Sequence, residues 1–448
     1  MDINYILTGK LSKVWSKFIF AAVIGVVFNA IYSIVDGIFV GQGTGASGLA
    51  GVNLAWPAIT IILGLGLLFG TGASSLISIA IGKGETEHAE KIIGTTIKYV
   101  FLLGCLLSVL GIVFANPIVK FLGASTDTYD YTRDYFIVVY LMAIPYLFAN
   151  TLTALVRADG NPNLSMFMVG VGAIGNIILD WLFVIVFDWG TAGAALATGA
   201  GVFLSSIVGF WYFTKGPSHL KIKKDYLTWN TAILVDILKI GFVSFMVQLS
   251  IGIVILIQNN IIYTYGTTDD IAIFCVAGYI ISLYTQLCVG MSQGMQPLIG
   301  YHYGATKLKR MRHILFITLG ISTFIGLLAL FALNQFGYHI IKLFGTETHL
   351  LDLTYQRVLI FCRGIPFIGI LYVMSAYYQA LNKNIYANVL SIGRGCVLQV
   401  CFSIILPPII GVDGIFYAQF LSDSFSIFIV IGVLMFSYWR SKKSQVNL

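Results

Sequence analysis

Two aspartates, Asp36 and Asp180, each interrupt a stretch of sequence that is otherwise apolar. A carboxylate inside a membrane is energetically costly and persists mainly where it handles ions, protons or a charged substrate. Asn176 lies four residues before Asp180, so the two side chains share one face of a helix. Two carboxylates, an amide and a nearby hydroxyl are oxygen ligands that a hard cation prefers, and either carboxylate could hold a proton instead. These residues therefore predict a site for coupled transport.

The composition is that of a polytopic membrane protein. Of the 448 residues, 58% are hydrophobic and only 10% are charged, which disfavours a soluble globular protein. The net charge of +7 comes from basic residues spread over short loops, so no nucleic-acid partner is expected. The six cysteines lack the spacing of a metal site and are expected to pack as small hydrophobic residues. No motif predicts an enzyme, a cofactor or an ATP-binding loop.

Apolar runs of about 20 residues or more predict twelve membrane-spanning helices, and hence an all-α integral membrane protein. The expected helices cover approximately residues 18–40, 50–81, 92–114, 135–156, 164–187, 192–213, 231–263, 272–300, 314–335, 357–380, 385–410 and 414–439. The first run is too long for the apolar part of a signal peptide and has no A-x-A cleavage site. It is therefore expected to remain as the first helix.

The distribution of basic residues predicts the orientation. Most of the 26 Lys and Arg residues fall in the terminal segments and the even-numbered loops, whereas the odd-numbered loops hold only Lys120, Arg133 and Lys342. Because basic loops stay on the cytoplasmic side, both termini are expected in the cytoplasm of a multi-pass protein of the cell membrane.

The two halves of the sequence resemble one another at an offset of about 220 residues. The matching segments are 70–84 with 290–304, 121–123 with 343–345, 144–146 with 365–367, and 190–193 with 411–414. Both copies have six expected helices and start on the same side, which indicates a parallel repeat around a central cavity. The expected domains are an N-terminal six-helix lobe (1–213), a basic cytoplasmic linker (214–230) and a pseudo-symmetric C-terminal six-helix lobe (231–448).

Asp36, Asp180 and Thr198 are predicted to lie at one depth in the membrane. At 1.5 Å per residue, all three fall within roughly 6–11 Å of the expected outer boundary, so side chains from three helices can meet. The alternative is that each polar group only satisfies a neighbour as a packing contact. This alternative applies most to Thr198, because hydroxyl groups commonly bond back to their own helix.

The second half carries a different set of intramembrane polar residues. Arg394 and Asp423 could pair and neutralise one another, and the sequence leaves open whether this pair is structural or contacts substrate or a coupling ion. Gln248 belongs to a set of long amides, some of which are expected to face a wet cavity. Among the many aromatic residues, Tyr32 is a further candidate for the polar network.

Three segments resemble the MATE family of multidrug and toxic compound extrusion transporters: residues 28–41, 70–84 and 156–162. The resemblance extends over nearly the whole chain. It implies a twelve-helix, two-lobe antiporter that expels amphipathic, often cationic compounds in exchange for Na⁺ or H⁺. Matched by motif and spacing, the coupling ion of such a protein would be held by Asp36, Asn176, Asp180 and Thr198, with Asn150 as a further member of the network.

The sequence departs from the family pattern in two places. Some family members carry a coupling glutamate on the seventh helix, where this chain offers only Gln248 and Gln258. Others have a proline in the first helix at which it bends. Residues 18–40 contain no proline, which leaves Gly25 as the obvious soft point.

These observations together predict a monomeric secondary antiporter for amphipathic or cationic small molecules. One alternative is a flippase of related architecture for a lipid-linked precursor. A flippase for an anionic lipid should line its cavity with several cations, and the second half offers Arg363 and Arg394. A membrane receptor or channel subunit without a coupled cycle is a second alternative.

Overall fold

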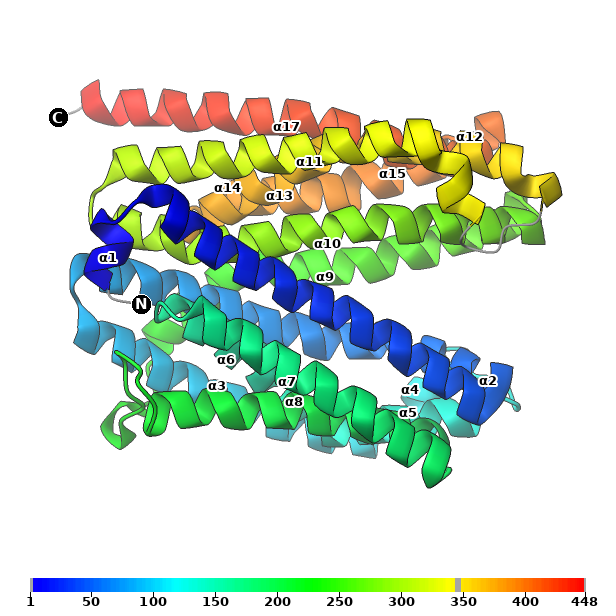
Figure 1. Ribbon diagram of the computed structural model, residues 1–448, viewed down its shortest axis with the longest axis horizontal. Coiled ribbons are helices and arrows are strands. Elements are labelled where there is room, and N and C mark those ends of the chain that lie inside the picture. The colour runs from blue at the N-terminus through cyan, green and yellow to red at the C-terminus, as the bar shows by residue number, and fades with distance from the viewer. Residues whose placement is uncertain (1–2, 343–347, 447–448) are drawn as a thin grey trace.

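A computed structural model describes residues 3–342 and 348–446 of the chain. Within these ranges the chain is almost entirely helical and contains no strand, and Figure 1 shows the helices running along the long axis of the molecule. The first half contains α1 (Ile3–Thr8), α2 (Leu11–Lys83), α3 (Thr86–Val113), α4 (Ala115–Phe121), α5 (Tyr129–Leu141), α6 (Ala143–Ala158), α7 (Pro162–Asp180) and α8 (Gly190–Thr214). The second half contains α9 (Thr231–Tyr265), α10 (Thr268–Gly304), α11 (Leu308–Lys342), α12 (Leu351–Cys362), α13 (Ile365–Ala380), α14 (Asn384–Ile392), α15 (Gln399–Ile405), α16 (Pro407–Ile410) and α17 (Asp413–Val446).

The described chain confirms the twelve predicted spans. Eleven helical segments are long and apolar enough to cross a membrane, and the pair α5 and α6, bent by 56°, makes the twelfth. α2 contains the first two spans, Leu11–Gly45 and Ser47–Lys83, which meet at a break. The break lies at Gly45, where φ is +68°, a value that favours glycine. The first span is thus longer than the predicted range of residues 18–40.

Both ends of the chain lie at the same end of the bundle, on the left of Figure 1. We call this end, which also carries the loop of residues 215–230, the basic end. The first span of α2, dark blue in Figure 1, crosses the molecule obliquely between the halves. Near the basic end it packs on α10, where Gly290 and Gly294 leave no room for a Cβ beside Val23 and Phe18. Farther along, the same span packs on α7.

The two halves approach most closely near the basic end. Gly241 of α9 lies against the backbone carbonyl of Leu68, so an added Cβ would collide with α2. Hydrogen bonds also join the halves there, because Gln296 Nε2 donates to Ser75 Oγ (2.7 Å) and Arg157 Nη1 donates to Gln293 Oε1 (3.0 Å). Small residues and polar side chains are the usual means of holding helices together in a membrane.

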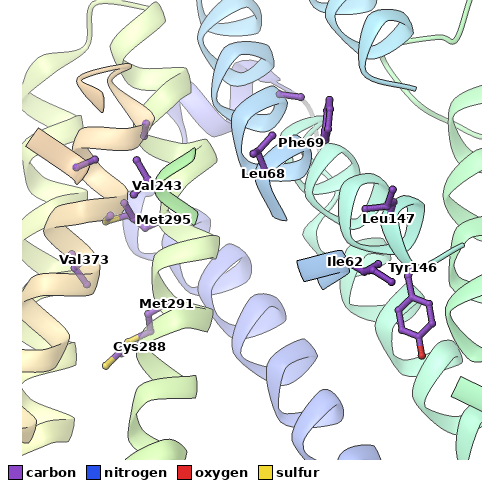
Figure 2. Close-up of a cluster of buried hydrophobic side chains, with 14 of the residues drawn as sticks. Ile62, Leu68, Phe69, Tyr146, Leu147, Val243, Cys288, Met291, Met295 and Val373 are labelled. Atoms are coloured by element: carbon purple, nitrogen blue, oxygen red, sulfur yellow. The ribbon is translucent and has the colours of Figure 1, made fainter. Parts of the chain in front are cut away.

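Apolar side chains fill the interior between these polar contacts. Figure 2 shows part of this core, in which Ile62 and Leu68 of α2, Leu147 of α6 and Met295 of α10 are buried. An apolar interior supplies no partner for a polar group, so each buried polar side chain must find a specific donor or acceptor.

The loop between the halves is anchored by Asp159, which follows α6 directly. Its Oδ2 accepts hydrogen bonds from the hydroxyl groups of Tyr212 and Ser218, both at 2.7 Å, and from the backbone N–H of His219 at 3.1 Å. Burial raises the pKa of the Asp159 carboxyl group, whereas these donors act in the opposite direction. The start of the basic loop is therefore held against the first half.

A buried cation joins three helices of the second half at the end opposite the basic end. Arg357 of α12 is 8% exposed and forms ion pairs with Asp270 of α10 and with Asp413 Oδ1 of α17, the second at 2.7 Å. Asp270 also belongs to a capping box with Thr267 at the start of α10. One guanidinium group thus connects three spans at the end opposite the basic end.

Replacing Arg357 with methionine is expected to lower the free energy of unfolding by about 3 kcal/mol, because it leaves a buried carboxylate without a cation. Thermal or chaotrope unfolding in detergent would measure the change. Lys309→Met, at an exposed lysine, is the matched control. Equal stability of the two variants would contradict a stabilising role for the Arg357 ion pairs.

Replacing Gly241 with alanine is expected to separate α9 from α2 and populate states in which the basic end is more open. Spin labels at His88 and Lys309, exposed residues of the two halves, would report the separation as an added population of longer distances. The control is Gly278→Ala, because an added Cβ at Gly278 meets nothing within 4 Å. An unchanged distance distribution in Gly241→Ala would show that this contact does not limit opening.

Candidate functional site

The structure brings together the four residues that the sequence singled out in the first half. Asp36 comes from the first span of α2, Asn176 and Asp180 from α7, and Thr198 from α8, and α7 packs against both other helices. The Nδ2 of Asn176 donates to Thr198 Oγ1 over 3.1 Å. The carboxyl groups of Asp36 and Asp180 lie within hydrogen-bonding reach of one another. A bond between them requires that one carboxyl group carries a proton.

Several oxygen atoms of this cluster lack a donor. Asp36 Oδ1, both carboxyl oxygens of Asp180 and Asn176 Oδ1 are buried, and no donor of the described chain meets them with hydrogen-bond geometry. The amide of Asn176 also lies near Asp180, but its N–H group is directed at Thr198. Buried oxygen atoms without donors are rare in proteins and call for an ion, a proton or water. Two carboxylates in contact repel one another, so the cluster is suited to a cation or a proton.

The cluster lies at similar depths in the three helices, and Asp36 and Thr198 lie deeper than the sequence predicted. Asp36 is nine residues before Gly45, Asp180 is six before Val186, and Thr198 is eight after Gly190. At 1.5 Å per residue these positions are roughly 9–14 Å from the end opposite the basic end. The prediction of 6–11 Å was too shallow for Asp36 because the first span continues to Gly45.

A π-helical turn begins directly after Asp180, at Trp181–Val186. A second π-helical turn, Gly393–Leu398, contains Arg394. Each turn lies in the fifth span of its half, so the two halves share the irregularity. A π-helical turn redirects the side chains around it and often occurs at functional sites. Neither turn is distinguishable in the sequence, because its composition does not differ from the rest of the helix.

Three tyrosines surround the cluster. The hydroxyl group of Tyr146, a residue labelled in Figure 2, lies beside Thr198, and the buried ring of Tyr135 lies near Asp36. Tyr32 is half-buried and is close to Asp36 as well. Tyr135 was not among the predicted residues, because no local pattern distinguishes it from other aromatic residues of the spans.

Asn150 and Gln248 lie outside the cluster's hydrogen bonds. Asn150 Nδ2 donates to the backbone carbonyl of Tyr146, one turn earlier in the same helix, at 3.1 Å. Gln248 is half-buried on α9, where its Cβ faces Gly64 of α2. Both residues therefore lie at contacts of α2 with neighbouring helices.

Arg394 and Asp423 form an ion pair in the second half. Asp423 is fully buried, and its Oδ1 accepts from Nε (2.7 Å) and lies 2.6 Å from Nη2 of Arg394. Its Oδ2 accepts from Gln419 Nε2 at 2.9 Å, and Gln419 in turn accepts from Gln399 at 2.8 Å. Both carboxylate oxygens of Asp423 thus have donors, whereas those of Asp180 have none.

Comparison with known proteins identifies the family. The family model MatE matches residues 21–182 and 240–405, one segment in each half. The multidrug export protein MepA of Staphylococcus aureus is 25% identical over 431 residues, which cover 94% of this chain and 93% of MepA. The protein of the same name from Staphylococcus saprophyticus is 24% identical over 429 residues, with the same coverage of both chains.

Solved structures share the fold. A crystal structure of MATE in the straight conformation superposes with a TM-score of 0.91 at 24% identity, covering 100% of this chain and 99% of the other. A MOP superfamily transporter from Pyrococcus furiosus superposes with a TM-score of 0.90 at 23% identity and the same coverage. Because the family model covers most of both halves, this chain belongs to the MatE family of multidrug and toxic compound extrusion transporters.

Proposed function

We propose that this protein is a secondary antiporter that exports amphipathic or cationic small molecules in exchange for H⁺ or Na⁺. The observation that carries the proposal is the cluster of buried oxygen atoms without donors at Asp36, Asn176 and Asp180. The MepA relatives are named as multidrug export proteins, which supports a similar class of substrate. The protein acts as a monomer in the cell membrane, with the basic end in the cytoplasm, because basic loops stay on that side.

The coupling ion would bind between Asp36 and Asp180, with Asn176 and Thr198 as neutral oxygen ligands. Either Na⁺ or a proton would remove the repulsion between the two carboxylates and so hold the first span of α2 against α7. The same span contacts α10 nearer the basic end. Ion occupancy at one end of this span is therefore mechanically linked to the contact between the halves.

Exchange follows if ion and exported compound favour different states of the transporter. A ligand shifts a conformational equilibrium only by its differential affinity for the two states. We propose that the lobes 1–213 and 231–448, joined by the linker 214–230, rock about a central cavity. The close contact of the halves near the basic end corresponds to the state that is closed toward the cytoplasm. The first span is helical through Gly25, and we propose that it moves as one helix.

The flippase alternative receives little support from the charges of the second half. An anionic lipid-linked precursor would need several free cations, but Arg394 is neutralised by Asp423. Of the two arginines, this leaves Arg363, which is exposed. Export of neutral or cationic compounds fits this charge distribution better.

Replacing Asp36 with asparagine is expected to abolish ion-coupled efflux and leave folding largely intact, because asparagine keeps the size of the side chain but cannot bind a proton. Efflux of a fluorescent cationic dye from proteoliposomes, with Na⁺ and pH gradients imposed separately, would measure the loss and identify the ion.

The matched control is Asp127→Asn, which removes an exposed carboxylate outside the cluster. Wild-type efflux by the Asp36→Asn variant would overturn the coupling proposal. Absence of efflux in the folded wild-type protein under either gradient would favour the lipid flippase alternative.

The Arg394–Asp423 pair is expected to be structural. Either Arg394→Gln or Asp423→Asn should destabilise the protein by about 3 kcal/mol, because each leaves a buried charge unpaired, and the double variant should be more stable than either single variant. Unfolding measurements on the four proteins would give the coupling free energy. If the double variant keeps stability but loses ion-coupled efflux, the pair takes part in transport.

A further inference from the structure

A cleft of about 1120 Å³ opens on the second half at the basic end of the bundle. It is lined by residues of α9, the loop of residues 381–383, α14 and the last turns of α17. α14 packs against both α9 and α17 and so forms the floor between them. None of the residues described above for the ion cluster lines this cleft.

The charges of the cleft are positive. Lys239 of α9 and Lys383, directly before α14, both line it and are exposed, and within the described chain neither ammonium group takes part in an ion pair. Among the residues that the structure describes, no acidic residue lines the cleft. Asp236, one turn before Lys239, is exposed outside it. Two cations at one mouth without a carboxylate favour an anionic ligand.

The floor of the cleft offers acceptors without donors. Asn384 and Asn388 lie four residues apart on α14, on one face of the helix. The Oδ1 atom of each is buried and receives no hydrogen bond from the described residues, while Asn384 Nδ2 donates to Asn382 Oδ1 at 3.1 Å. Both side chains line the cleft, so a rotation of each amide group would bring these acceptors to a ligand with hydroxyl donors next to its anionic group.

Much of the remaining lining is apolar and exposed. Phe242 of α9 is 41% exposed, Ile385 of α14 is 73% exposed and Phe436 of α17 is 53% exposed. Ser437 also lines the cleft, and the sequence after it changes from apolar to basic, with Arg440, Lys442 and Lys443, which places the cleft near the membrane boundary. Lys239 is eight residues inside the seventh span, and its long side chain can bring the charge to that boundary. The cleft thus combines a polar mouth with an apolar wall.

We propose that this cleft binds an anionic phospholipid with a hydroxylated headgroup, of the phosphatidylglycerol type, from the cytoplasmic leaflet. The phosphate lies between Lys239 and Lys383, the headgroup hydroxyls donate to Asn384 and Asn388, and an acyl chain follows the apolar wall. Basic pockets between spans on the cytoplasmic side recognise lipid headgroups in this way. The choice of leaflet rests on the orientation in the proposed function, whereas the site itself does not.

Binding is tested on the full-length protein in detergent, with thermal unfolding and native mass spectrometry under added lipid. Phosphatidylglycerol is expected to bind and to raise the unfolding midpoint, and phosphatidylcholine, which has no net charge, is expected to have a much smaller effect. The double variant Lys239→Gln with Lys383→Gln should bind phosphatidylglycerol at least tenfold more weakly. Lys309→Gln, an exposed lysine at the same end but outside the cleft, should bind as the wild type does.

Two further measurements distinguish binding of the whole lipid from binding of a phosphate group alone. Soluble glycerol phosphate should not raise the unfolding midpoint, because it lacks the acyl chain. The Asn388→Ala variant should lose more affinity for phosphatidylglycerol than for phosphatidic acid, which has no headgroup hydroxyls. Equal binding of phosphatidylcholine, unchanged binding by the double lysine variant, or full replacement by glycerol phosphate would overturn the proposal. The assay needs no transport, so its failure is distinct from a failure of the antiporter proposal.

Discussion

The absence of water in the bilayer interior is the constraint on which this structure depends. Helices satisfy their own backbone groups, which is why the described chain crosses the membrane only as helices. Polar side chains inside the spans are not satisfied by the backbone hydrogen bonds of the helix, and most need partners on other helices. A buried polar group without a partner lowers the stability of the protein. Such a group is usually retained because it has a function.

The two halves meet this constraint in different ways. In the second half, Asp423 receives donors at both oxygens from Arg394 and Gln419, so the charge is neutralised within the protein. In the first half, Asp36 and Asp180 face one another, and buried oxygens of both lack donors. The first arrangement satisfies its buried charge within the described protein, whereas the second leaves acceptors that could take a cation, a proton or water. The two halves thus share an irregularity in their fifth spans but differ in how their buried charges are satisfied.

The close packing near the basic end and the ion cluster both involve the first span of α2. Gly241 permits backbone contact between α9 and α2, and Gly290 and Gly294 permit contact between α10 and the first span. Close contacts of this kind weaken quickly when helices separate, because a gap of about 1 Å already forfeits up to about half of the van der Waals attraction between the facing atoms. The first span connects this packing to Asp36, about two and a half turns before its far end.

The sequence by itself determined the class of protein, the twelve spans and the candidate acids, because hydropathy and the cost of an intramembrane charge act along the chain and need no knowledge of neighbours. It left open whether Arg394 and Asp423 pair, and it placed the end of the first span near residue 40 instead of Gly45.

Tertiary structure decided which polar groups meet: Asp36 with Asp180, Asn176 with Thr198, and Asp423 with Arg394. It also decided the π-helical turns beside Asp180 and at Arg394, and the cleft between α9 and α17. These features depend on the rotation and separation of helices that are distant in the chain. Such quantities are set by the packing of side chains from many segments at once, and no local pattern of residues encodes them.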